Sequence, residues 1–125
     1  MKQREQIINN YVAAYNNFDI DSMLIHLDED ILFNNVSEGK INMTLEGITA
    51  FKAQAEKAKS MFSERQQQII QFKHEDHQTE IDIEYHATLA VDLSDELKKG
   101  NKLELKGKSI FKFSQKKIIA ITDVS

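Results

Sequence analysis

Very few side chains in this sequence have the type and spacing that covalent or proton-transfer chemistry requires. The 125 residues include no cysteine, which excludes disulfides, thiolate metal ligands and a cysteine nucleophile. The chain offers no Ser-His-Asp set, no paired carboxylates and no glycine-rich phosphate loop. Any chemistry therefore has to come from single titratable groups.

Asp123 is the best-placed carboxylate for such a role. It lies in a predicted last strand, Lys117 to Val124, and alternates with Thr122. It then shares a face with Ile119 and Ile121, which predicts an inward side chain near the mouth of a pocket. There Asp123 could serve as a polar anchor or an acid, and pairing with a lysine at the rim is the alternative.

His86 is the second candidate, because imidazole titrates near neutral pH and can act as a general base. It falls in the middle of a predicted strand, Thr79 to Val91, on the face opposite Tyr85. A His in this position more often lies on a partly exposed outer face or at a contact between two subunits. We favour that interpretation and keep the general base as the alternative.

The run His74-Glu75-Asp76-His77 is the only stretch that resembles a metal site. In a strand its two histidines would face opposite ways, and in a turn they would be mobile. With no third inward ligand, the run is predicted to be a solvated hairpin loop. We expect neither a metal nor a cofactor.

Composition narrows the class of protein. The length predicts one domain spanning residues 1–125. The net charge of -4 argues against a nucleic-acid partner, because a protein that binds nucleic acid needs a basic face. The N-terminus lacks an apolar run of signal-peptide length, and no stretch approaches the roughly 18 apolar residues of a membrane span. A cytoplasmic protein is the simplest expectation.

Helical periodicity marks the first part of the chain. Apolar residues from Ile7 to Phe18 follow the spacing of one buried helical stripe, which includes Tyr11 and Tyr15. Asn16 and Asn17 are predicted to end this helix.

A second, short helix is predicted next, from Ser22 to His26, with Asp19 or Asp21 as its cap. An acidic turn, Leu27 to Asp30, then precedes a strand from Ile31 to Val36. A brief strand containing Ile41, Met43 and Leu45 comes before a third helix, Ile48 to Met61, whose apolar stripe includes Phe51.

The period then changes to two. Alternating apolar and polar residues predict strands at Glu64–Lys73, Thr79–Val91, Lys102–Ser114 and Lys117–Val124. Long strands with one polar face are typical of an antiparallel sheet, since parallel strands need crossovers for which there is no room here. The element order therefore predicts an α+β fold, with N-terminal helices packed on one strongly bent antiparallel sheet.

Three phrases of the sequence, in this order, resemble the nuclear-transport-factor-two-like superfamily in its SnoaL-like and ketosteroid-isomerase-like branch. They are YVAAYNNFDIDSMLIHLDEDILFNN, TLEGITAFKA and LELKGKSIFKFSQKKIIAITDVS, which together span most of the chain. The resemblance implies a cone-shaped, cystatin-like fold with an apolar interior pocket and a homodimer formed through the outer sheet. Gly107 could supply part of the bending that such a sheet needs.

The resemblance also suggests roles for individual residues. In family members with steroid isomerase activity, a helix Tyr and a buried Asp form an oxyanion hole, and a first-strand Asp shuttles the proton. Matching phrases place these positions at Tyr11, Ser109 and Asn35 respectively. An amide cannot abstract a proton near neutral pH, and Ser109 is a weaker donor than a carboxylic acid, so steroid isomerisation is disfavoured.

The resulting prediction is a pocket for an apolar small molecule, with walls typical of such sites. Its predicted lining is Tyr11, Tyr15, Phe33, Asn35, Phe51, Ser109, Phe111 and Asp123. The two tyrosines could equally be core aromatics whose hydroxyls find a partner, an interpretation favoured for Tyr15 and balanced for Tyr11.

Two functions fit this pocket. One is a SnoaL-like enzyme that performs acid–base isomerisation, cyclisation or hydration on an apolar carbonyl compound. The other is a non-catalytic binding or dimerisation module, because fold does not fix function. The two differ in whether a titratable group, Asp123 or His86, points into the pocket beside Tyr11.

Overall fold

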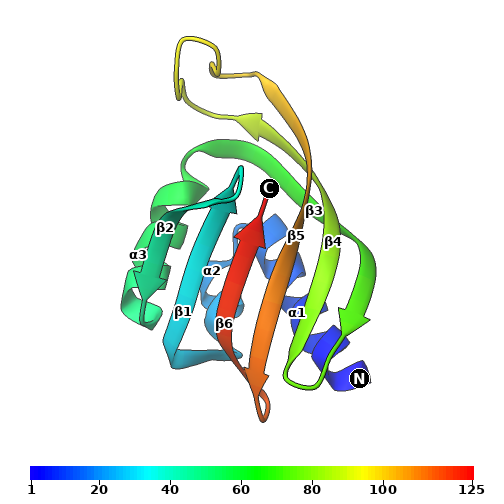
Figure 1. Cartoon of the computed structure of the whole chain (residues 1–125). Helices are drawn as coiled ribbons and strands as arrows, with labels where there is room; N and C mark the ends of the chain where they lie inside the picture. Colours follow the sequence, from blue (N-terminus) through cyan, green and yellow to red (C-terminus); the bar gives the residue numbers. More distant parts are fainter.

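Six strands form one strongly bent sheet in the computed structural model, which describes all residues 1–125. The strand order across the sheet is β2-β1-β6-β5-β4-β3, and the three helices pack together against one of its faces (Figure 1). Both edges, β2 and β3, are unpaired, so the sheet is bent but not closed. This is the α+β architecture that the sequence predicts.

The helices are α1 (Lys2–Asn16), α2 (Ile20–Leu24) and α3 (Ile48–Lys59). Helix α1 buries Ile7, Ile8, Val12 and Ala14 against the core, and it ends at Asn16 as expected. None of the helices is long and apolar enough to cross a membrane.

The cap of α2 is Asp19 rather than Asp21. Its carboxylate accepts hydrogen bonds from the backbone N–H of Ser22 at 3.2 Å and from the Ser22 hydroxyl at 2.6 Å. The short helix therefore begins and ends two residues earlier than the predicted Ser22 to His26. The residue before Asp19, Phe18, adopts a positive φ of 57°, which reverses the chain between the two helices.

The strands are β1 (Leu27–Ser37), β2 (Lys40–Glu46), β3 (Phe62–His74), β4 (Gln78–Leu89), β5 (Lys102–Ser114) and β6 (Lys117–Val124). The predicted acidic turn was wrong, because β1 already begins at Leu27. The side chain of Leu27 is only 2% exposed and its backbone pairs with Ile118, so burial overrides the turn propensity of the acidic residues that follow.

One strand pair departs from the predicted antiparallel pattern. Strands β1 and β6 lie side by side and run parallel, while every other neighbouring pair is antiparallel. The chain between these two strands contains α3 and the other sheet strands, so it serves as the crossover that a parallel pair requires. The alternation of apolar and polar residues within a strand does not predict this parallel pairing, because it gives no information on which strand becomes the neighbour.

A bulge in β6 decides which side chains face inward. The register with β5 shifts between Lys112 and Phe113, so that Ile119 is an extra residue on β6. As a result Ile118 is fully buried whereas Ile119 is 37% exposed. The predicted face of Ile119, Ile121 and Asp123 was therefore wrong for Ile119, and the alternation beyond the bulge leaves Ile121 and Asp123 inward.

Candidate functional site

A cavity of about 380 Å³ lies between the helices and the inner face of the sheet. Six of the eight predicted lining residues border it: Tyr11, Tyr15, Phe33, Asn35, Phe51 and Asp123. They come from α1, β1, α3 and β6, so four separate elements meet around the cavity, which we call the central pocket.

The remaining two predicted residues, Ser109 and Phe111, do not border the central pocket. Phe111 is 1% exposed and packs edge-on against Tyr11, with ring centroids 5.7 Å apart. Ser109 is 2% exposed and donates its hydroxyl to Oδ1 of Asp123 at 2.6 Å. Both therefore support residues of the pocket without bordering it.

Seven further residues line the central pocket and were missed by sequence reasoning: Met23, Met43, Gln54, Ala55, Ala58, Phe62 and Arg65. Ala55 and Ala58 share the predicted apolar stripe of α3 with Phe51, so helical spacing could have identified them. Arg65 could not be found in this way, because it lies in a polar run, Glu64 to Gln68, that gives no alternation signal.

Asp123 is the one carboxylate in the wall. Burial raises the pKa of its side chain to about 6, and the hydrogen bond from Ser109 opposes this rise. The register of β1 with β6 places Asn35 next to Asp123, and the Asn35 amide donates to Oδ1 of Asn42 at 2.8 Å. A carboxyl group with a pKa of about 6 exchanges its proton easily near neutral pH, which suits acid–base chemistry.

Tyr11 offers a free hydroxyl to the same space. Its hydroxyl makes no hydrogen bond to the protein, whereas that of Tyr15 lies 2.9 Å from the hydroxyl of Tyr85. Burial, and then the charge of Asp123, raise the pKa of Tyr11 far above its usual value, while Arg65 opposes the rise. Tyr11 is therefore a neutral hydrogen-bond donor beside a carboxylate.

Tyr15 has a structural role by comparison. Its hydroxyl is paired with Tyr85, and its pKa is raised first by burial and then by Tyr85. Its backbone carbonyl accepts a hydrogen bond from Nε of Arg65 at 2.9 Å. Tyr15 therefore connects α1 to β3 and β4, in keeping with the interpretation favoured from its helical position.

Arg65 brings a positive charge to the pocket. It is 5% exposed, and Cζ of its guanidinium lies 3.7 Å from the ring centroid of Tyr15 and 4.5 Å from that of Phe18. Nη2 of Arg65 is buried and has no hydrogen-bond partner. A buried donor without an acceptor is uncommon in proteins.

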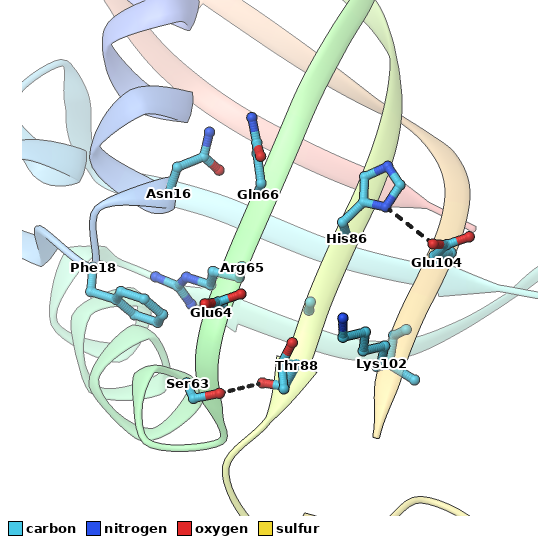
Figure 2. A pocket seen from close by; sticks show the side chains of 12 residues that line it. Asn16, Phe18, Ser63, Glu64, Arg65, Gln66, His86, Thr88, Lys102 and Glu104 are labelled. Atoms are coloured by element: carbon cyan, nitrogen blue, oxygen red, sulfur yellow. Dashed lines mark hydrogen bonds and ion pairs between the residues drawn. The ribbon is translucent and has the colours of Figure 1, made fainter. Parts of the chain in front are cut away.

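His86 lies elsewhere. Figure 2 shows it on β4 next to Glu104 of the neighbouring strand β5. Both residues line a second hollow of about 460 Å³, together with residues of the edge strand β3. The His86 ring Nδ1 is 3.8 Å from the Glu104 carboxylate, and both side chains are at least half exposed. His86 is not part of the central pocket, whereas Arg65 borders both hollows.

The metal-like run has a structural explanation. Nε2 of His74 lies 2.7 Å from the carboxylate of Glu5, and Nδ1 lies 2.9 Å from the Thr79 hydroxyl. The Arg4 guanidinium donates to the backbone carbonyls of the same hairpin, including that of Glu75 at 2.6 Å. No three His, Cys, Asp or Glu side chains come together in a geometry that could hold a metal ion.

The central pocket thus combines apolar walls with three functional groups of different character. Asp123 can take or give a proton, Tyr11 can donate a hydrogen bond, and Arg65 carries a positive charge. This set can bind an apolar molecule that contains oxygen and can move a proton on it.

Comparison with known proteins shows which family the chain matches. The model of the SnoaL-like domain matches residues 8–121, which is nearly the whole chain. No curated protein matches the chain.

Several solved structures share the fold. A protein provisionally named polyketide cyclase from Xanthomonas campestris pv. campestris has a TM-score of 0.84 at 20% identity, with 99% of this chain and 90% of that one covered. A provisionally named SnoaL-like polyketide cyclase from Jannaschia sp. CCS1 has a TM-score of 0.83 at 10% identity, with coverage of 98% and 84%. TerC, co-crystallised with polyporic acid, has a TM-score of 0.78 at 14% identity, with coverage of 97% and 89%. At these identities the likeness establishes the fold.

Proposed function

The chain belongs to the SnoaL-like domain family, and we propose that it is an acid–base enzyme acting on an apolar carbonyl compound in the central pocket. The observation that carries the proposal is the inward position of Asp123 beside the unpaired hydroxyl of Tyr11. A partly buried carboxyl group with a raised pKa next to a neutral donor is a common arrangement for moving protons on carbon acids.

The proposed reaction begins with the carbonyl oxygen of the ligand accepting a hydrogen bond from Tyr11. The Asp123 carboxylate removes a proton from the carbon next to the carbonyl, and the electron pair left behind delocalises onto the oxygen as an enolate. In a β,γ-unsaturated ketone the electron pair also reaches the γ-carbon, and return of the proton there shifts the double bond and completes an isomerisation. Attack of the enolate carbon on a second carbonyl of the same molecule, followed by proton return to the new alkoxide, completes a cyclisation.

The position of Asp123 accounts for the amide at Asn35. In the steroid isomerase pattern the base belongs to the first strand, where this chain has Asn35. The parallel pairing of β1 and β6 puts Asp123 directly beside that position, so a carboxylate from the neighbouring strand could replace the missing base. Steroid isomerisation itself stays disfavoured, because the base would approach the substrate from a different strand.

The solved structures support a small organic ligand of this kind. Two of them carry the name polyketide cyclase, and TerC was crystallised with polyporic acid. The mostly apolar central pocket of about 380 Å³ is of the size that accepts such molecules.

Proton exchange provides a test that does not require the natural substrate. In D₂O, NMR would follow the exchange of α-protons of 2-tetralone and related apolar ketones for deuterium with and without the protein. We expect faster exchange with the wild type and a loss of at least about 100-fold in Asp123→Asn, the range typical for removal of a general base. His86→Asn, on the outer hollow, serves as the control and should exchange like the wild type.

The alternative is a non-catalytic binding module, which the amide at Asn35 favours. Ketones that bind and raise the melting temperature without any Asp123-dependent exchange would establish this alternative and refute the enzyme. Equal exchange rates in the wild type and Asp123→Asn would likewise refute a role for Asp123 as base.

The homodimer implied by the family resemblance is part of the same proposal. Leu32 on β1 and Ile119 on β6 are 38% and 37% exposed, which gives the middle of the sheet apolar side chains on its outer side. Sedimentation equilibrium of the wild type and Leu32→Lys tests this assignment. A monomeric wild type would rule it out.

A further inference from the structure

Arg65 places a positive charge in the wall of the central pocket that no carboxylate neutralises. The side chain is 5% exposed, and Nη2 is buried without an acceptor. The ion pairs of the structure all join other residues: Lys52–Asp21, His74–Glu5, His86–Glu104 and Lys108–Glu80. Burying a charge without a partner is costly, so this group requires an explanation.

Asp123 is not the missing partner. A guanidinium in contact with it would hold the pKa of the carboxyl group low, yet that pKa is raised by burial, and only the Ser109 hydrogen bond opposes the rise. Tyr11 responds to both charges, since Asp123 raises and Arg65 lowers its pKa. Arg65 and Asp123 thus do not form an ion pair with each other, and the charge of each one affects the pKa of Tyr11.

The surroundings of Arg65 hold its guanidinium in place without satisfying it. Cζ of the guanidinium lies 3.7 Å from the ring centroid of Tyr15 and 4.5 Å from that of Phe18. Nε donates a hydrogen bond to the backbone carbonyl of Tyr15 at 2.9 Å. Figure 2 shows the side chain leaving β3 towards Phe18. Aromatic contacts of this kind fix the orientation of an arginine and offset part of the cost of its burial, but they leave Nη2 without an acceptor.

We propose that Arg65 binds an anionic oxygen group, a carboxylate or an acidic enol, on an otherwise apolar ligand of the central pocket. The inference rests on the proposed function and deepens it, because it adds the charge of the ligand to its carbonyl and its apolar body. A planar guanidinium binds such a group through charge-assisted hydrogen bonds that are short and directional. The anionic end would lie at Arg65, and the reacting carbon at Tyr11 and Asp123.

Arginine-selective NMR tests this inference on the wild type. The chain has two arginines, Arg4 and Arg65, so ¹⁵N-arginine labelling gives two sets of guanidinium signals. Arg4 binds hairpin carbonyls near the surface and serves as the internal control. Sodium 2-naphthoate at pH 8 should shift the Arg65 signals and leave those of Arg4 in place, and methyl 2-naphthoate should shift neither to a comparable degree.

Binding measurements on two variants give a second test. In the wild type we expect 2-naphthoate to bind at least about tenfold more tightly than its methyl ester, the difference typical of one charge-assisted hydrogen-bonded pair. Arg65→Gln should reduce this preference to within about twofold. Lys106 is exposed and lines a neighbouring hollow but not the central pocket, so Lys106→Gln should keep the preference.

Several results would overturn the inference: equal affinity of the wild type for acid and ester, a preference that survives in Arg65→Gln, or one that Lys106→Gln abolishes as well. If Arg65→Gln does not fold, the NMR experiment on the wild type decides alone. The outcome is separate from that of the exchange assay. If the protein exchanges the α-protons of ketones but does not prefer the acid to the ester, the proposed enzyme stands and the role of Arg65 is refuted. If it prefers the acid but does not exchange the protons, Arg65 keeps its role and Asp123 is not a catalytic base.

Discussion

Asp123 shows how the fold adapts a single side chain to chemistry at the expense of stability. Its raised pKa means that the folded state binds a proton more tightly than the unfolded chain does. The contribution of Asp123 to the free energy of unfolding is therefore fully present below the unfolded pKa of about 4 and is lost as the pH rises through about 6. Above that pH the ionised carboxylate stays partly buried, and the cost in free energy no longer changes with pH.

Asp123→Asn should remove this cost. The amide has nearly the same shape and can still accept the Ser109 hydrogen bond, so we expect the free energy of unfolding at pH 8 to rise by at most about 3 kcal/mol. At pH 4 the gain should vanish. Urea unfolding at both pH values measures it, with exposed Asp95→Asn as the control, and a variant less stable than the wild type at pH 8 would contradict the assignment.

Tyr11→Phe separates a binding hydroxyl from a structural one. The hydroxyl has no protein partner, so its removal should change the free energy of unfolding by less than about 1 kcal/mol and should weaken the binding of 2-tetralone. Tyr85→Phe is the matched control, because it breaks the 2.9 Å contact with Tyr15. A loss of more than about 2 kcal/mol in Tyr11→Phe would show that its hydroxyl has a buried structural partner.

Among the elements, β5 and β6 position Ser109 and Asp123 opposite each other. Their close approach depends on Gly107, where an added Cβ would lie 2.6 Å from the carbonyl oxygen of Val124. The structural role of this glycine is thus clearance for the end of β6, in addition to any contribution to sheet bending.

Gly107→Ala should force β6 away from β5. We expect a destabilisation of about 1–3 kcal/mol, the range for inserting a methyl group where none fits, and a weaker Ser109–Asp123 hydrogen bond. Chemical denaturation gives the energy, and the pH dependence of the exchange reaction reports the Asp123 pKa, which should rise. Gly100→Ala is a weak comparison because of its positive φ, so Ser114→Ala, an exposed site on the same strand, is the control. Wild-type stability in Gly107→Ala would contradict the close approach.

At the scale of the whole molecule, contacts distant in sequence hold the N-terminal helix over the sheet. Arg4 donates to the backbone carbonyls of Glu75, Asp76 and Gln78, and Glu5 contacts His74. These contacts join α1 to the β3–β4 hairpin, at residues about seventy positions further along the chain.

Arg4→Ala should loosen this connection. We expect a loss of about 1–2 kcal/mol in the free energy of unfolding, since several charge-assisted hydrogen bonds disappear together. Hydrogen exchange should become faster in the hairpin 75–77 and in the first turn of α1, and remain unchanged in β1. Lys2→Ala, a neighbouring exposed lysine, is the control. Uniformly faster exchange over the whole chain would show a global effect instead.

The sequence alone determined the element types, because helical and strand periodicities follow from local side-chain geometry. It indicated the α+β class, the inward stripe of α1 and part of the pocket wall, including Tyr11, Phe51 and Asp123. Only the tertiary structure decided the parallel pairing of β1 with β6, the bulge at Ile119 and the inward position of Arg65. These features depend on which segments become neighbours, and residues far apart in sequence leave no local pattern of that choice.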